Sequence, residues 1–162
     1  MQKKWITALL VLLGGIIVLF YYNKYQVAPS IDITKLEIIT ETEQPFNMAQ
    51  LKGKKLIVSF YASWCGNCLE ELKDLNKIKN SDLNDVEVVC ITDESIEHLK
   101  QFKENKGYPF LFLKLKKNFQ DINIYSIPVT YIVNEKLEIV EEHLGYVDWT
   151  DPSTLNHIKS LY

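Results

Sequence analysis

The longest uninterrupted apolar stretch of the chain lies near its start, at residues 5–22 (WITALLVLLGGIIVLFYY), and it contains no charged side chain. As a helix that rises about 1.5 Å per residue, it would be about 27 Å long, which is close to the thickness of the hydrocarbon core of a bilayer. The pattern therefore predicts a transmembrane anchor at 5–22. It lies between a short tail at 1–4 and a polar tether at 23–35.

The residues around this stretch favour a retained anchor over a cleavable signal peptide. The chain continues as NKYQVAPS, without the small-residue cleavage site that follows a signal peptide. Lys3 and Lys4 precede the span, and short basic flanks tend to stay in the cytoplasm. We therefore expect residues 1–4 to be cytoplasmic and the chain beyond the anchor to face outward.

The rest of the chain alternates between apolar strands and amphipathic helices. Residues 56–62 (LIVSFYA) and 86–92 (VEVVCIT) are continuous apolar runs, as strands buried on both faces require. From Asn67 the apolar residues recur at helical spacing, and 95–107 begins and ends with residues typical of helix caps. The order strand, helix, strand, helix predicts a parallel sheet with helical crossovers.

The last third of the chain predicts a hairpin and a closing helix. A short strand within 108–115 and a helical turn near 119–125 come first. Residues 129–134 and 137–146 then read as two strands joined by a tight connection. Pro152 suits the first position of a final helix.

Composition limits the functions that are open to this chain. Hydrophobic residues make up 47% of the 162 positions and charged residues 24%, so we expect 36–162 to fold as one globular domain. All 18 basic residues are lysines, and the 15 beyond position 25 face 21 acidic residues, which leaves a formal charge of −6. This balance, without arginine for bidentate phosphate binding, argues against a nucleic-acid partner.

The chemistry of the chain is concentrated in a pair of cysteines, Cys65 and Cys68, where the first buried strand passes into a helix. Zinc would require about four ligands, and the histidines are scattered without metal-site spacing. A purely structural disulfide that closes so short a loop would add little stability. Redox chemistry is therefore the favoured interpretation, whereas Cys90, inside an apolar strand, is expected to pack in the core.

The position of the pair assigns a role to each sulfur. At a helix N-terminus, unpaired backbone N–H groups and the positive end of the dipole lower the pKa of a thiol. We expect Cys65 to be the attacking sulfur for this reason. Cys68, one turn inward and less exposed, should resolve the mixed disulfide.

Residues 60–68 (FYASWCGNC) resemble the active-site stretch of thioredoxin-like proteins, and with the anchor the chain resembles the membrane-tethered TlpA/ResA-type thiol-disulfide oxidoreductases of bacteria. The resemblance covers most of 36–160. It implies an α/β thioredoxin-like fold, with a central mixed β-sheet flanked by helices, and catalysis that needs no metal and no organic cofactor. It also implies a single-pass protein of the bacterial inner membrane, with its catalytic domain facing the periplasm.

Four further residues are candidates for the site, and the resemblance implies the roles of three of them. Ile127 and Pro128 match the loop in which the family carries a cis proline facing the cysteines, where the backbone pairs with an extended substrate. Glu71, three residues after Cys68, matches a glutamate of the TlpA/ResA type and is the candidate acid/base; a solvated helix face is the alternative. Trp64, which precedes Cys65, is expected to shield the active-site sulfur and to offer a surface to substrate; core filling is the alternative.

Two departures from ordinary thioredoxins bear on function. Ser59 stands where those proteins carry a buried aspartate, so their proton relay does not transfer to this chain. Gly66 and Asn67 replace the commoner Gly-Pro between the cysteines, which can change the reduction potential.

The implied activity is the reduction of disulfides in exported proteins, with apocytochrome c as one example, followed by re-reduction by a membrane electron donor. Three alternatives remain open at this point. They are a disulfide oxidase or isomerase, a peroxidase, and a non-catalytic thioredoxin-like binding module.

Overall fold

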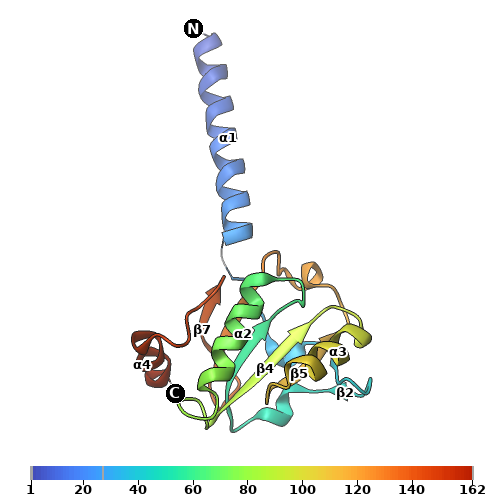
Figure 1. Cartoon of the computed structure of the whole chain (residues 1–162). Coiled ribbons are helices and arrows are strands. Elements are labelled where there is room, and N and C mark those ends of the chain that lie inside the picture. The colour runs from blue at the N-terminus through green and yellow to red at the C-terminus, as the bar shows by residue number, and fades with distance from the viewer. Residues whose placement is uncertain (1, 27, 162) are drawn as a thin grey trace.

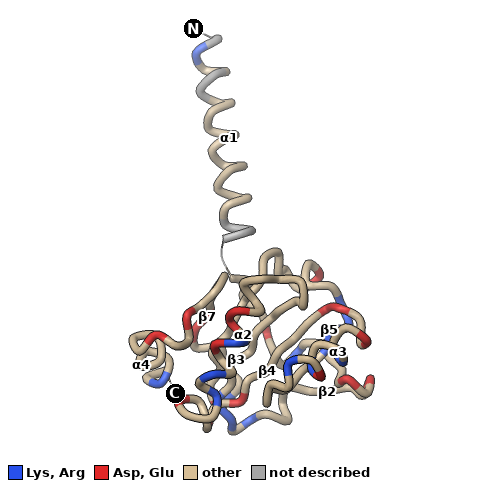
Figure 2. Tube along the Cα trace, viewed as in Figure 1, with Lys and Arg blue, Asp and Glu red and all other residues tan. Residues whose placement is uncertain are grey.

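The computed structural model of the chain describes residues 2–26 and 28–161. Its first element, helix α1 (Gln2–Gln26), projects away from an α/β domain (Figure 1). Within it, Lys4–Tyr22 is long and apolar enough to cross a membrane and is not covered by the rest of the chain. The described side chains of α1 beyond Lys4 are uncharged (Figure 2), which agrees with the apolar stretch predicted at 5–22.

The domain is built on one mixed sheet, with the strand order β2-β1-β5-β4-β3-β6-β7 in the described part of the chain. The strands are β1 (Ile38–Ile39), β2 (Pro45–Phe46), β3 (Lys55–Phe60), β4 (Val86–Thr92), β5 (Leu111–Leu115), β6 (Val129–Val133) and β7 (Ile139–Leu144). The central strands β3, β4 and β5 run parallel, as the alternating pattern predicts. The other pairings are antiparallel, including the predicted hairpin of β6 and β7.

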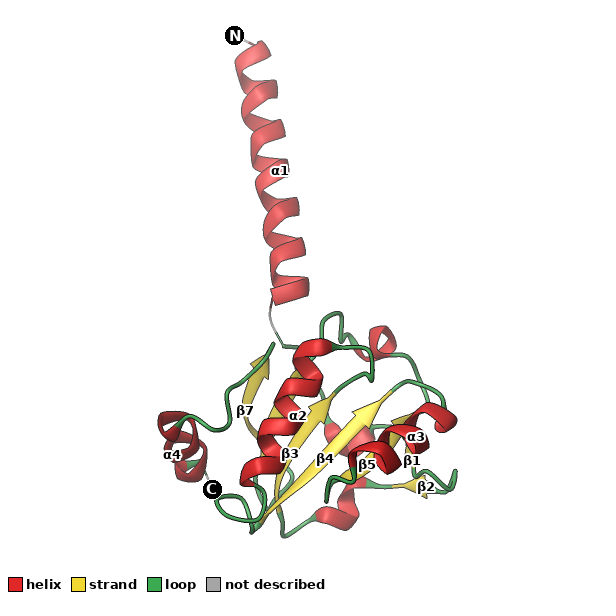
Figure 3. Cartoon of the chain, in the orientation of Figure 1, coloured by secondary structure: helices red, strands yellow, loops and turns green. Residues whose placement is uncertain are grey.

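Helices α2 (Gly66–Ile78) and α3 (Ile96–Lys106) lie together on one face of the sheet, and α4 (Pro152–Ser160) lies beyond β7 (Figure 3). The described residues also form three short 3-10 helices: η1 (Ile33–Lys35), η2 (Met48–Leu51) and η3 (Phe119–Ile122). The predicted caps of α3 are confirmed, because the hydroxyl of Ser95 accepts from a backbone N–H and Gly107 ends the helix with a φ of +60°.

Successive residues of β3 point to opposite faces of the sheet, which produces two cores. Ile57 packs beneath α2 with Leu72, whereas Leu56 and Val58 pack on the other face. All four side chains are fully buried, and burial of each stabilises the fold by about 1.5–3 kcal/mol. The face beneath α2 also contains both cysteines of the predicted pair, and its packing therefore fixes the site.

Two boundaries differ from the sequence-based prediction. Part of the segment assigned to a tether packs on the domain, because Ile33 in η1 is 1% exposed and Ala28 is also buried. The last strand is shorter than 137–146, because Leu137 (φ 68°) and Gly145 (φ 88°) adopt left-handed backbone conformations that end the ladder.

Candidate active site

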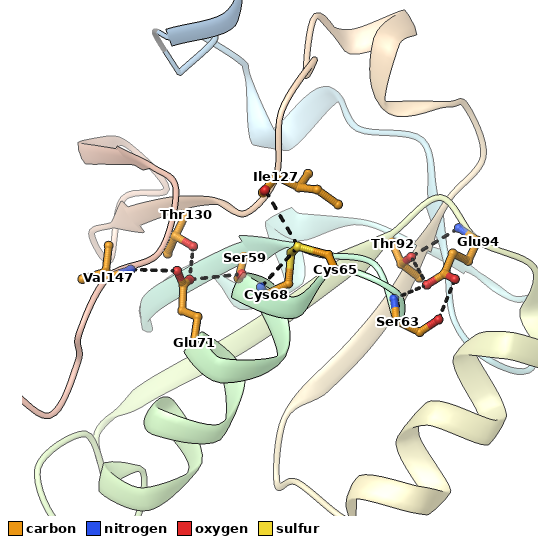
Figure 4. Close-up of a disulfide and its surroundings, with 10 residues drawn as sticks. All are labelled: Ser59, Ser63, Cys65, Cys68, Glu71, Thr92, Glu94, Ile127, Thr130 and Val147. Carbon is orange, nitrogen blue, oxygen red and sulfur yellow. Dashed lines mark hydrogen bonds between the residues drawn. A yellow bond between two sulfur atoms is a disulfide. The ribbon is translucent and has the colours of Figure 1, made fainter.

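The two cysteines lie at the junction of β3 and α2, as predicted. Cys65 is the N-cap of α2, where its sulfur accepts from the N–H of Cys68 at 3.2 Å, and the two sulfurs are joined by a disulfide (Figure 4). Cys65 is 8% exposed and Cys68 only 1%. Both residues are therefore buried, and Cys65 is the more exposed of the two.

A backbone carbonyl faces the sulfur of Cys65 from the loop before β6. The Ile127–Pro128 peptide bond is cis, as the resemblance implies, and the carbonyl oxygen of Ile127 lies 3.8 Å from Sγ of Cys65 (Figure 4). The carbonyl of Pro128 accepts from the N–H of Gly145 at 2.8 Å. The cysteines, the proline loop and the end of β7 thus converge at one edge of the domain.

Glu71 is fully buried, so the interpretation of this residue as part of a solvated helix face is wrong. Its carboxylate accepts from the hydroxyl of Thr130 at 2.5 Å and from the N–H of Val147 at 3.2 Å, and the hydroxyl of Ser59 lies 3.5 Å away (Figure 4). The preceding Glu70 is exposed and paired with a lysine one turn away. Of these two neighbouring glutamates, only Glu71 is buried, and it alone remains the candidate acid/base.

Burial controls the electrostatics of this pocket. It raises the pKa of Glu71 to about 7, although hydrogen bonds from Thr130 and Val147 act in the opposite direction. Burial also raises the pKa of the free Cys90 thiol, and the charge of Glu71 adds to that effect. Cys90 therefore stays a neutral core residue, as predicted, while Glu71 can gain or lose a proton near pH 7.

A second carboxylate holds the turn before Cys65 from the other side. Glu94 accepts from the N–H of Ser63 at 2.6 Å and from its hydroxyl at 2.7 Å, with the hydroxyl of Thr92 at 3.4 Å (Figure 4). Lys114 donates to the carbonyl of Glu94 at 2.7 Å. Sequence reasoning missed Glu94, although a carboxylate just after β4 lies at the edge where parallel strands place their functional groups.

Trp64 projects from this turn and is 76% exposed, so it does not fill the core. A shallow cleft lies beside it, lined by Trp64, Asp93 and residues of 119–127 that include Ile127. Two of its lining residues are neighbours of Cys65, because Trp64 precedes it in the chain and the carbonyl of Ile127 lies 3.8 Å from its sulfur. In the described part of the chain, no cluster of three or more His, Cys, Asp or Glu side chains is arranged to hold a metal ion.

Comparisons with known proteins agree with this geometry. The chain matches the Redoxin family over residues 26–158. Thioredoxin-like protein YneN of Bacillus subtilis is 28% identical over 161 residues, covering 90% of this chain and 92% of that protein. Thiol-disulfide oxidoreductase ResA of Bacillus anthracis is 24% identical over 122 residues, covering 73% and 68% of the two chains.

The fold has close counterparts among solved structures. The solution structure of a thiol:disulfide interchange protein from Bacteroides sp. superposes with a TM-score of 0.66 at 19% identity, covering 83% of this chain and 90% of that one. This likeness establishes the thioredoxin-like fold. With the family match and the disulfide at the N-terminus of α2, it follows that the chain belongs to the Redoxin family and is a thioredoxin-like thiol-disulfide oxidoreductase of the ResA type.

Proposed function

We propose that this protein reduces disulfides of exported proteins at the outer face of the bacterial inner membrane, to which α1 anchors it. The observation that carries the proposal is the arrangement around one disulfide. Cys65 is the more exposed of the two cysteines, whereas Cys68 is enclosed, and Glu71, three residues further along α2, is a buried carboxyl with a pKa raised to about 7. Such an arrangement serves both halves of a dithiol exchange.

The exchange proceeds in two steps that start from the reduced pair. The Cys65 thiolate, favoured by the N–H groups at the start of α2, attacks one sulfur of a substrate disulfide. The bond between the substrate sulfurs breaks, the leaving sulfur takes up a proton, and a mixed disulfide with Cys65 forms. Cys68 then attacks Sγ of Cys65, which closes the internal disulfide and releases the second substrate thiol.

Glu71 supports the second step. The enclosed Cys68 must lose a proton before it can attack, and Ser59, which stands at the position of the thioredoxin aspartate, is too weak a base to accept that proton. Glu71 lies one turn along α2 and has a pKa raised by burial to about 7, so it accepts the proton in its ionised form. Overall, the substrate gains two electrons and two protons, and the cysteine pair loses them.

The surface around Cys65 supports an extended polypeptide as the substrate. The loop at Ile127 and Pro128 can pair with an added strand, and the exposed ring of Trp64 offers an apolar contact beside it. Apocytochrome c is one substrate of this kind. A membrane dithiol is the proposed electron donor, because the internal disulfide must be reduced again after each turnover.

Trapping in membranes tests the proposal. Cys68→Ser leaves Cys65 unable to resolve its mixed disulfide, so we expect exported proteins to accumulate covalently on the full-length chain and to be released by a reductant. Cys65→Ser/Cys68→Ser is the matched control and should capture nothing, and Cys90→Ser should behave as the parent chain. Failure of Cys68→Ser to capture any protein would contradict a substrate-reducing role.

The direction of exchange is tested separately by equilibrating the pair with glutathione. A reducing enzyme predicts that the Cys65–Cys68 disulfide resists reduction by glutathione and has a potential near that of ordinary thioredoxin. A pair that glutathione readily reduces would instead support oxidation of substrates.

A further inference from the structure

The segment that follows β7, residues 145–149, joins the proline loop to the two buried carboxylates of α2. Gly145 donates its N–H to the carbonyl of Pro128, as described above. The next residue, Tyr146, donates its hydroxyl to Oδ2 of Asp74 at 2.7 Å, and Val147 donates its N–H to Oε2 of Glu71 at 3.2 Å. Because they are three positions apart, the two carboxylates share one face of α2 and are held by consecutive residues of one segment.

Asp74 is a firm attachment point for this segment. Its side chain is 5% exposed and lies 2.5 Å from Nζ of Lys77. Although burial acts in the opposite direction, hydrogen bonds from Lys77 and Tyr146 lower the pKa of Asp74. The hydrogen bond to Asp74 in turn raises the pKa of Tyr146 to about 12. At neutral pH the contact is therefore a charge-assisted hydrogen bond, which is the stronger kind.

Contacts near its two ends hold the segment 145–149 in place. Gly145, with φ 88°, turns the chain out of β7, so no ladder hydrogen bonds of that strand hold the residues that follow. Trp149 is fully buried and anchors the far end. Val147, whose N–H binds Glu71, lies between Tyr146 and Trp149 in the chain. The hydrogen bond of the Tyr146 phenol to Asp74 is therefore the contact that fixes the segment directly before Val147.

We infer that Tyr146 is a positioning residue for Glu71: its hydrogen bond to Asp74 holds the 145–149 segment over the Glu71 carboxyl and keeps water away from it. This inference rests on the proposed role of Glu71 and names a residue that regulates it. The phenol itself does not contact the reacting sulfurs. It acts through the amide of Val147 and through Trp149, whose indole N–H faces the carboxyl without forming a hydrogen bond of standard geometry.

The groups that face Glu71 from the surrounding elements are uncharged. They are Ser59 of β3, Cys90 of β4, Thr130 of β6, and Val147 and Trp149 of the segment. Burial is consequently the main cause that raises the pKa of Glu71, and the segment supplies part of that burial. Opening the segment should lower the pKa, because hydration of the ionised carboxylate outweighs the loss of one amide hydrogen bond.

Carboxyl carbon NMR of the full-length chain in detergent tests the inference, with ¹³C-labelled glutamate and the protein in its disulfide form. In that form neither Cys65 nor Cys68 titrates, and Glu71→Gln identifies the Glu71 signal by its loss. In Tyr146→Phe we expect the pKa of Glu71 to fall by about one pH unit or more, in the range that relief of burial produces. Tyr131→Phe is the matched control, because it removes a hydrogen bond of equal length, 2.7 Å, to the carbonyl of Pro29 in the other core.

Two variants of the acceptor keep the test independent of the phenol substitution. Asp74→Asn retains an oxygen that accepts from Tyr146 and should leave the pKa of Glu71 near that of the parent. Asp74→Ala should lower it as much as Tyr146→Phe, and the two changes combined should lower it no further. Circular dichroism verifies that each variant is folded.

The inference is overturned if the pKa of Glu71 in Tyr146→Phe equals that in Tyr131→Phe or exceeds that of the parent. This outcome is distinct from failure of the proposed function. If Glu71→Gln turned over substrate at the parental rate, the acid/base role of Glu71 would be rejected, whereas the titration would still show whether Tyr146 controls its environment.

Discussion

Two glutamates flank the disulfide-bearing turn, Glu71 on α2 and Glu94 after β4, and they meet different surroundings (Figure 4). Glu71 is fully buried, and burial raises its pKa to about 7. Glu94 is 12% exposed along its side chain and accepts two hydrogen bonds from Ser63. The carboxyl of Glu71 can therefore exchange a proton near pH 7. The carboxyl of Glu94 instead holds the backbone at Ser63, two residues before Cys65.

The two environments suit the same functional group to two different proposed roles. The described groups that hydrogen-bond to Glu71 are neutral, and their effect is outweighed by burial, which raises its pKa to about 7 and makes its protonation reversible near neutral pH. Glu94 accepts a hydrogen bond from the backbone N–H of Ser63, and this bond holds the turn before Cys65 in place. The comparison predicts that the two residues affect different steps of the exchange.

The largest effect is expected from Glu71→Gln. Without a proton acceptor for Cys68, closure of the internal disulfide at pH 7 should slow by about 10²-fold, a typical contribution of general base catalysis. In the parent, the rate of this step should rise with pH through about 7 as Glu71 ionises, and the variant should lack that inflection. Rapid mixing of the reduced protein with a small disulfide separates this step from the initial attack by Cys65.

Glu70→Gln is the matched control, because Glu70 is the adjacent residue but is exposed and paired with Lys73. Its rates should equal those of the parent. If Glu71→Gln slowed the attack by Cys65 as much as it slowed ring closure, the assignment of Glu71 to the second step would be wrong.

A smaller effect is expected on stability. The folded protein keeps the proton of Glu71 up to about pH 7, whereas the unfolded chain releases it near pH 4.5, so stability should fall as the pH rises between these values. Between pH 5 and 8, the parent should lose about 2 kcal/mol relative to Glu71→Gln, since one pKa unit corresponds to about 1.4 kcal/mol. Urea unfolding of the parent and of Glu71→Gln, each in its disulfide form, at pH 5 and pH 8 measures this difference. If the free energy of unfolding changed equally with pH in the two proteins, the pKa of Glu71 would not be raised in the folded state.

Much of the fold could be predicted from local pattern, because the determinants are close in sequence. The strand at 86–92 and the caps Ser95 and Gly107 each follow from a few neighbouring residues. The end of β7 could not be predicted in this way. Its length depends on the backbone conformations of Leu137 and Gly145, which the apolar pattern of 137–146 does not encode.

The site residues that are close in sequence could be predicted as well, whereas those that meet only through the fold could not. Cys65 and Cys68 were evident from their spacing, and Glu71 from its offset on one helix together with the family resemblance. Glu94 and the pair of Tyr146 with Asp74 were missed, because they act across 31 and 72 positions of the chain. Such contacts exist only after the sheet brings the ends of β4 and β7 and the start of β6 to the edge where α2 begins.

The smallest effect is expected from Glu94, and it should appear in the first step of the exchange. Glu94→Ala leaves the N–H of Ser63 without its acceptor in a half-buried position, which should cost about 1–2 kcal/mol of stability. The turn that carries Cys65 would then be less fixed, so formation of the mixed disulfide should slow a few-fold while ring closure is unchanged. Glu94→Gln retains one acceptor oxygen and should show about half the loss. Glu104→Gln, on the exposed face of α3, is the control and should show none, and a slowed ring closure in Glu94→Ala would remove the distinction between the two carboxylates.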